Sequence, residues 1–232
     1  MIKMMHEKRI VLDSRLSAIA ELVGKCEAYA DIGCDHGRLG AFLLQNGWVS
    51  RALLMDISDP SLDKARALVR LLGLEDKTRF LVGDGAEPLD CAVDCVVIAG
   101  MGGTTVAGII ERGHAKLGNA RLILQANVAN RELRERLMLT GYRIQNERVI
   151  KDGRRHYIII EAVPGQAAYS EQELTVGPVL MKEKPAALAE YAEFRLRVAR
   201  KALSGAESGA EREVSESLRR EIEIWEEVRA SL

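Results

Sequence analysis

The sequence has few aromatic residues, which make up only 4% of its 232 positions. Proteins that bind single strands of nucleic acid on extended stacking platforms rely on such rings, so this mode of binding is disfavoured. Positive charge is not in excess either, because the formal net charge is -1. Contact with a polyanion therefore has to come from a local basic patch.

Cysteine is scarce, and long apolar runs are lacking. The four cysteines have no C-x-x-C spacing and lie in or beside apolar segments, which predicts buried reduced thiols and no zinc site. They are Cys26, Cys34, Cys91 and Cys95. No apolar run is long enough to cross a membrane, and residues 1–13 lack the apolar core of a secretory signal. We therefore expect a cytoplasmic protein without a metal site or a membrane partner.

The most informative stretch is residues 29–40, which read YADIGCDHGRLG. A short apolar strand over residues 27–32 is expected to run into Gly33 and Gly37, and a helix to start near Arg38. Glycines at such a turn let the backbone approach a ligand closely. The pattern predicts a nucleotide-type cofactor, with a plain tight turn as the alternative.

Acidic residues in this stretch set it apart from a dinucleotide fingerprint. Asp31 ends the strand, and Asp35 stands where G-x-G-x-x-G has its middle glycine. A carboxylate is a poor neighbour for a pyrophosphate, which prefers backbone N–H groups. The loop instead suits a ligand with positive charge, such as the sulfonium and amino groups of S-adenosylmethionine.

Two further strands are expected to end in an acid. Asp56 closes residues 52–57 and lies 23 positions after Gly33 (56 − 33), close to the ~20-residue interval at which a carboxylate meets ribose hydroxyls. An N-cap is the alternative. Asp84 follows residues 79–82 and could accept a hydrogen bond from the exocyclic amine of adenine, or simply form an Asp-Gly turn. Parallel strands would bring these acids to one ligand-binding edge.

The next two strand ends carry glycines and amides. Residues 93–99 are almost uniformly apolar, as in a central strand, and lead into the turn GMGG at residues 100–103. Glycines there would let a flat group lie near the backbone. Residues 121–125 form the next strand, and the amides of Gln125 and Asn127 could face a base edge or serve loop hydrogen bonds.

The later strands decide the fold class. Residues 142–150 and 156–163 flank an Asp-Gly turn, which predicts an antiparallel hairpin after five βα units. This arrangement is typical of an α/β, Rossmann-like doubly wound methyltransferase sheet with an antiparallel last strand. We expect that domain to occupy residues 1–165.

Residues 166–232 are expected to form a C-terminal helical domain. Helices over 185–203 and 211–232, linked by SGAESG, should pair as an antiparallel coiled-coil hairpin. Arg195, Arg197 and Arg200 could pair with glutamates of the second helix or contact phosphates of a nucleic acid. The hairpin could also join two copies of the chain, so a monomer and a weak homodimer are both open.

Other charges have two readings as well. Arg15 lies off the apolar face of an expected helix over residues 13–23. It could be a solvated surface charge or a substrate contact. Arg154 and Arg155 belong to the hairpin turn and could be solvated or bind phosphate. The alternating charges of residues 131–136, RELRER, predict a solvated helix face.

Taken together, these motifs resemble the bacterial tRNA (adenine-22 N1)-methyltransferase family. The resemblance spans nearly the whole chain and rests on ADIGCDHGRLG, GDG, AGMGG, LILQAN and VGPVLMKEK. It implies methyl transfer from S-adenosylmethionine to N1 of an adenine in tRNA. Other acceptors, or a tRNA-binding protein with a vestigial cofactor pocket, are the alternatives.

The resemblance also implies roles for individual residues. The methionine end of the cofactor would contact the first strand-to-helix turn, the ribose the second strand end, the adenine the third, and the transferable methyl the GMGG turn. The residues concerned are Asp31, Gly33, Cys34, Asp35, His36, Asp56, Ile57, Gly83, Asp84, Gly85, Gly100 and Met101. Because methylated N1 carries positive charge, we hypothesise that Asp35 stabilises it as the catalytic carboxylate. The tRNA would contact Arg15, Arg154, Arg155, Arg195, Arg197 and Arg200.

Overall fold

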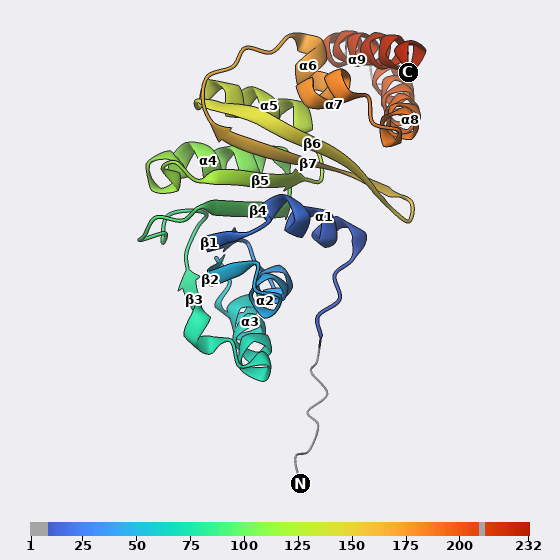
Figure 1. Cartoon of the computed structure of the whole chain (residues 1–232). Helices are drawn as coiled ribbons and strands as arrows, with labels where there is room; N and C mark the ends of the chain where they lie inside the picture. Colours follow the sequence, from blue (N-terminus) through green and yellow to red (C-terminus); the bar gives the residue numbers. More distant parts are fainter. Residues whose placement is uncertain (1–8, 209–211) are drawn as a thin grey trace.

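The computed structural model describes residues 9–208 and 212–232, which fold around one seven-stranded sheet (Figure 1). The strand order is β3-β2-β1-β4-β5-β7-β6. The strands are β1 (Cys26–Ile32), β2 (Val49–Asp56), β3 (Thr78–Val82), β4 (Cys95–Met101), β5 (Arg121–Ala126), β6 (Tyr142–Asp152) and β7 (Arg155–Pro164).

Strand direction confirms the predicted fold class. Strands β1 to β5 pair in parallel, whereas β7 inserts between β5 and β6 and is antiparallel to both. The tight turn at Gly153 explains why β6 and β7 are antiparallel, because a two-residue hairpin can join only antiparallel strands. Two strand starts were wrong by more than one residue: β2 starts at Val49 and not at residue 52, and β4 starts at Cys95 and not at residue 93. Asp94, before β4, instead accepts hydrogen bonds from the N–H groups of Glu27 and Ala28.

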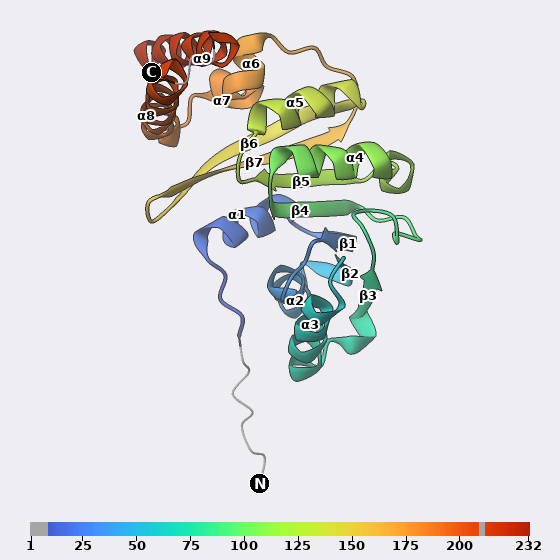
Figure 2. The same cartoon turned by 180° about the vertical axis from the view of Figure 1, so that it is seen from behind.

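Helices cover both faces of the sheet (Figures 1 and 2). The first seven helical segments in chain order are α1 (Ser14–Val23), α2 (Arg38–Gln45), α3 (Asp59–Leu72), the short 3-10 helix η1 (Glu75–Lys77), α4 (Gly103–Leu117), α5 (Asn130–Leu139) and α6 (Glu171–Val176). They are followed by α7 (Pro178–Glu183), α8 (Ala187–Ser208) and α9 (Arg212–Ser231).

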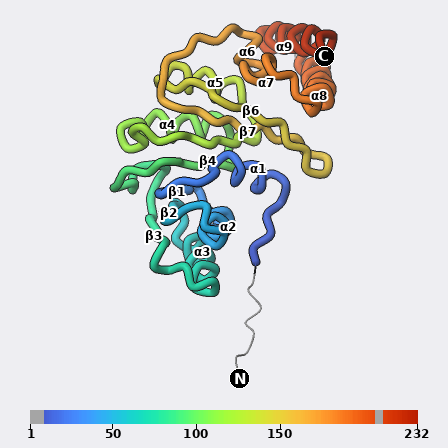
Figure 3. The backbone as a smooth tube through the Cα atoms, viewed as in Figure 1, coloured from blue at the N-terminus to red at the C-terminus, as the bar shows by residue number. Residues whose placement is uncertain are grey.

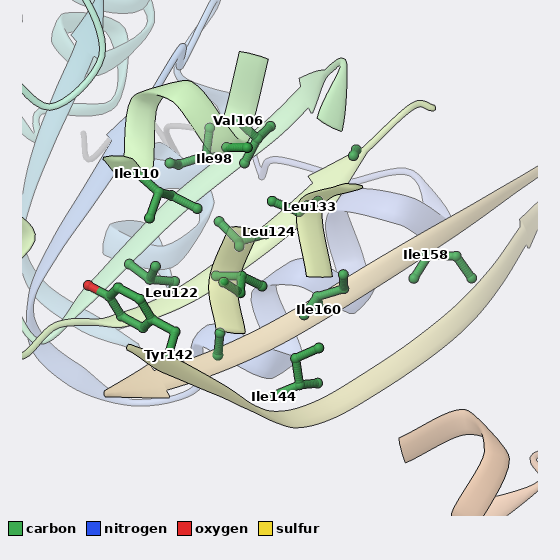
Figure 4. Close-up of a cluster of buried hydrophobic side chains, with 14 of the residues drawn as sticks. Ile98, Val106, Ile110, Leu122, Leu124, Leu133, Tyr142, Ile144, Ile158 and Ile160 are labelled. Atoms are coloured by element: carbon green, nitrogen blue, oxygen red, sulfur yellow. The ribbon is translucent and has the colours of Figure 1, made fainter. Parts of the chain in front are cut away.

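The side chains of the central strand β4 alternate between the two faces of the sheet and belong to two buried clusters. Val96 and Ile98 of β4 belong to the cluster under α4 and α5, while Cys95 and Val97 belong to the cluster under α1, α2 and α3. Figure 4 shows part of the first cluster, with Ile110 of α4 directed at the side chains of β4 and β5. Successive residues of a strand point to opposite faces, so an almost uniformly apolar strand has both faces covered.

The segment after β7 differs most from expectation. The chain crosses past α5 to reach α6 and α7, two short helices that the sequence pattern did not predict (Figure 3). The proposed link SGAESG is also wrong over residues 204–208, where α8 remains helical. Its last residue, Gly209, and the predicted helix start at Glu211 lie outside the described residues.

Helices α8 and α9 pair antiparallel, as predicted. Lys184, just before α8, donates to Ser231 at the end of α9, while Arg195 further along α8 pairs with Glu221 nearer the start of α9. Trp225 and Val228 are buried between α9 and its neighbours, but Val214 is 47% exposed, so the apolar face is shorter than the heptad pattern suggested.

A buried ion pair ties α6 and α7 to the sheet. Arg134 of α5 is 1% exposed and donates to Glu147 of β6 at 2.8 Å, as well as to backbone carbonyls of α6. Glu147 in turn accepts the N–H groups of Val179 and Leu180. The prediction that RELRER forms a solvated face is therefore wrong at Arg134, which the sequence could not distinguish from its exposed neighbours.

The C-terminal helices share their core with the sheet. Tyr191 of α8 and Trp225 of α9 belong to the same buried cluster as Ile98 and Ile160. His156 of β7 packs at 5.0 Å between ring centroids against Phe194 of α8. The domain boundary between residues 165 and 166 stays a prediction, although this packing joins the two parts closely.

Candidate active site

A cavity of about 360 Å³ lies at the carboxyl ends of β1, β2 and β4. Parallel strands place their C-terminal loops at one edge, which is where open α/β sheets bind ligands. The lining residues come from α1, the turn after β1, the end of β2 and the GMGG turn. They are Arg15, Leu16, Asp31, Gly33, Cys34, Asp35, His36, Arg38, Leu39, Asp56, Ala99, Gly100 and Met101.

The turn after β1 is held against the neighbouring strand. The N–H groups of Gly33 and Cys34 both donate to the carbonyl of Met55 on β2. Gly33 has a φ of +75°, and a Cβ placed on it would come 2.1 Å from Cε of Met101. The positive φ is what favours glycine at this position, since the end of the Met101 side chain could move aside.

Three carboxylates face this cavity. Asp31 is buried, and desolvation, reinforced by the charge of Asp56, raises its pKa to about 7. Asp56 accepts backbone N–H groups from Asp35 at 3.1 Å and from Ser58 at 2.9 Å. Asp35 is exposed, has a φ of +47°, and lies 3.6 Å from Nε2 of His36. Such a cavity suits a cationic ligand better than a pyrophosphate.

Cys34 also lines the cavity but is not a nucleophile. Burial, with the charges of Asp31 and Asp56, raises the pKa of its thiol far above neutrality. All four cysteines are free, and Cys34 and Cys95 are buried as expected, whereas Cys26 and Cys91 are only partly buried. The thiol of Cys34 therefore contributes a small apolar surface beside the carboxylates.

A chain of hydrogen bonds connects Arg15 to the GMGG turn. Arg15 donates to Oε1 of Gln125 at 2.7 Å, Gln125 donates to Asn127 at 3.1 Å, and Asn127 donates to the carbonyl of Gly100 at 2.7 Å. Both side-chain amides are thus taken up by hydrogen bonds within the protein. This supports the predicted role in loop hydrogen bonds and does not support contact with a base edge. Arg15, at the first position of this series of hydrogen bonds, lines the cavity. Its guanidinium lies 5.6 Å from the centroid of the Tyr157 ring.

The residues predicted to hold adenine lie outside this cavity. Gly83 is adjacent to it, because its N–H donates to the carbonyl of Asp56 at 3.1 Å. Asp84, however, pairs with Arg112 of α4 at 3.1 Å. Gly85 packs near Ile109, and Ile57 is 70% exposed beside the end of β2. The structure brings together the residues predicted to contact the methionine and ribose parts of the cofactor. The residues predicted to contact its adenine lie at the edge of this group.

The predicted basic contacts divide into two groups. Arg154 and Arg155 are exposed at the tip of the β6–β7 hairpin, and Arg197 is exposed on α8 without a partner among the described residues. Arg195 and Arg200 instead pair with Glu221 and Glu226 of α9. These pairs do not support a phosphate-binding role for Arg195 and Arg200.

Arg38 is a cavity residue that the sequence analysis did not assign. It donates to the carbonyl of Val11 at 2.7 Å and so ties the segment before α1 to α2. Its place directly after Gly37, at the first position of a helix beside the loop, was the available signal. Leu16, Leu39 and Ala99 also line the cavity, but nothing in their local pattern separates them from core residues.

A larger cavity of about 720 Å³ lies between α5, α6 and the α8–α9 hairpin. Its charged lining residues largely neutralise one another, as in the pairs Arg131–Glu171 and Arg195–Glu221. It lacks the converging strand ends of the smaller cavity, so we assign the site to the latter.

Within residues 9–208 and 212–232, no three His, Cys, Asp or Glu side chains are grouped as metal ligands. No helix in the same part of the chain is sufficiently long and apolar to span a bilayer.

Comparison with known proteins gives consistent matches. A family model described as a methyltransferase domain matches residues 12–160. The tRNA (adenine(22)-N(1))-methyltransferase of Bacillus subtilis is 36% identical over 183 residues, covering 75% of this chain and 77% of that protein.

Two crystal structures extend the match. The B. subtilis M1A22 tRNA methyltransferase TrmK superposes with a TM-score of 0.86 at 28% identity, over 95% of this chain and 99% of that one. TrmK of M. capricolum, in complex with the cofactor product S-adenosyl-homocysteine, gives 0.80 at 25% identity, over 94% and 98%.

Proposed function

The chain belongs to the tRNA (adenine(22)-N(1))-methyltransferase family, and on that premise we propose that it methylates N1 of adenine 22 in tRNA with S-adenosylmethionine. The observation that carries this proposal is the cavity at the sheet edge, where Asp31, Asp35 and Asp56 converge on the GMGG turn. When bound, S-adenosylmethionine supplies a methyl group on a positively charged sulfur.

The residues present fit this cofactor. Asp31 and Asp35 complement its sulfonium and amino groups, and the carboxylate of Asp56 at the end of β2 is left for the ribose hydroxyls. We assign the methionine end to Asp31, Gly33, Cys34, Asp35 and His36, and the ribose to Asp56. Ile57, Gly83, Asp84 and Gly85 border the position of the adenine, where Arg112 already engages Asp84.

The reaction needs alignment more than acid–base chemistry. N1 of adenine has a free lone pair at neutral pH, so proximity can supply much of the acceleration. Methylation leaves the base with a positive charge. Asp35, whose side chain is 69% exposed in the cavity, is placed to stabilise that charge.

Replacing Asp35 tests this role. We expect Asp35→Asn to lower kcat roughly tenfold, because a neutral amide stabilises the cationic product less well than a carboxylate does. Turnover can be followed by transfer of a tritiated methyl group to tRNA, and cofactor binding by calorimetry. Full turnover in a variant that still binds the cofactor would show that Asp35 is not catalytic.

The acceptor is tested directly by mass spectrometry. Unmodified tRNA treated with the purified protein should yield 1-methyladenosine, and nuclease fragments should place it at position 22. Methyl transfer that survives ribonuclease treatment would indicate a small-molecule or protein acceptor. No thermal shift with saturating S-adenosylhomocysteine would indicate a vestigial pocket instead.

The tRNA is proposed to contact four arginines, one at the cofactor cavity and three outside it. Arg15 lines the cavity, while Arg154, Arg155 and Arg197 are exposed on the hairpin tip and on α8. Backbone contacts of this kind fix register without reading sequence. Such a substrate also agrees with a cytoplasmic location.

A further inference from the structure

Val128 is an exposed aliphatic residue in the short loop between β5 and α5. Its side chain is 64% exposed, next to the GMGG turn that borders the cavity. Single exposed aliphatic residues are common on protein surfaces and need no explanation by themselves. What distinguishes Val128 is how firmly its backbone is fixed.

Three hydrogen bonds pin this loop to the GMGG turn. The N–H of Asn127 donates to the carbonyl of Met101 at 2.8 Å, and the N–H of Gly103 donates to the carbonyl of Val128 at 2.9 Å. The amide of Asn127 also donates to the carbonyl of Gly100 at 2.7 Å. The Val128 side chain is therefore presented on a rigid support.

The same loop contains strained backbone. Ala129 has a φ of +60°, a conformation that is unfavourable for an L-residue other than glycine. A Cβ placed on Gly103 would come 2.1 Å from the Ala129 carbonyl oxygen, so the backbone of this loop packs directly against the GMGG turn. Such strain persists only where the surroundings impose it, and it clusters at functional sites. Asp35 is in the same conformation on the cofactor side.

The position of Val128 beside the GMGG turn indicates which ligand it contacts. A Cβ on Gly102 would lie 3.9 Å from Cγ2 of Val128, and one on Gly100 would lie 3.8 Å from Nη1 of Arg15. Val128 and Arg15 thus both lie beside this turn, near different glycines. A nucleophile must come within about 3–3.5 Å of the carbon it attacks, so an adenine that reacts beside the turn comes within reach of these two side chains.

We propose that Val128 is the surface on which the target adenine rests during methyl transfer, an inference that depends on the proposed function. A base taken out of its stack loses its stacking and pairing contacts. The two methyl groups of Val128 replace part of that apolar contact and hold the ring plane in the orientation for attack. Val128 is therefore a positioning residue for the acceptor, with no role toward the cofactor.

The test compares variants of Val128 with a control variant at an aliphatic residue of similar exposure at the far end of α5. Leu139, at the other end of α5, is 65% exposed and provides the control Leu139→Ala. We expect Val128→Ala to lower kcat roughly tenfold, since the base loses its apolar support and its alignment. Binding of S-adenosylhomocysteine and Tm should match the wild type. Val128→Ile, which keeps an apolar branched side chain, should restore most of the rate.

A polar replacement of equal shape sharpens the result. Val128→Thr should be slower than the wild type, because its hydroxyl is poorly solvated beneath a base. A wild-type kcat in Val128→Ala, or an increase in KM alone, would overturn the proposal, since the residue would then be inert or a simple tRNA contact. If the wild-type protein transfers no methyl group to tRNA, the proposed function itself is wrong, a result distinguishable from failure of Val128 alone.

Discussion

Asp31 shows how one buried carboxylate links cofactor binding to pH. Desolvation, reinforced by Asp56, raises its pKa to about 7, so it is largely protonated below neutrality in the free protein. Its charged form is the one that favours a cationic ligand. Binding of S-adenosylmethionine should therefore release a proton from Asp31 at pH values below about 7.

Affinity for the cofactor is expected to rise with pH in this window. Below the pKa of Asp31, each pH unit should change Kd by up to about tenfold, because one proton must leave. Calorimetry between pH 5.5 and 7.5, in buffers of different ionisation enthalpy, measures both Kd and the proton release. Asp31→Asn should bind more weakly and lose this dependence. A Kd that is constant over the range would contradict the prediction.

At the scale of elements, the Arg134–Glu147 pair fixes α6 and α7 against α5 and β6. Both side chains are essentially inaccessible to solvent. Removing one member of such a pair leaves the other charge buried without its partner, which typically costs about 3–5 kcal/mol. We therefore expect Arg134→Met to lower the free energy of unfolding by an amount in this range, as measured by urea denaturation.

The same helix offers a matched control. Arg136 pairs with Glu111 at the surface, where both side chains are about half exposed. Exposed pairs contribute roughly 0–1 kcal/mol, so Arg136→Met should be nearly neutral. The double variant Arg134→Met with Glu147→Gln should be more stable than Arg134→Met alone. Equal stability of the Arg134 and Arg136 variants would show that the buried pair does not anchor α6 and α7.

For the whole molecule, the distribution of unpaired positive charge predicts the tRNA surface. Arg197 and Arg200 are close neighbours on α8, but only Arg200 pairs with a glutamate of α9 among the described residues. Arg197→Gln should therefore weaken tRNA binding and lower the slope of log K against log salt by about 0.7–0.9, the amount expected for one lost phosphate contact. Arg200→Gln removes the same charge and should change the slope little.

Titration of tRNA at several salt concentrations measures both effects. S-adenosylhomocysteine binding serves as the control, because neither residue lies near the cofactor cavity. Equal effects of the two substitutions would mean that only net charge matters. An unchanged slope for Arg197→Gln would place the tRNA elsewhere, with the hairpin tip at Arg154 and Arg155 as the remaining candidate.

Much of the architecture could be predicted because its signals are local. Ser58 accepts a hydrogen bond from Ser61 and caps α3, and Gly73 ends that helix with a φ of +67°, so both ends depend on residues within one turn of the helix. The cavity residues Asp31 and Asp56 followed from strand ends in the same way. The short helices α6 and α7 were missed because six residues carry too little periodicity to stand out.

By itself, the sequence determined the order of the strands and of the longer helices, the acidic strand ends and the resemblance that gave the family. Glycine turns, helix caps and apolar periodicity act within a few residues, so they can be read along the chain. Only the tertiary structure decided which charges are buried, paired or open to the site. Arg15 meets Gln125 across 110 positions, and Arg134 meets Val176 across 42. Such contacts depend on how distant elements pack, and no local pattern encodes them.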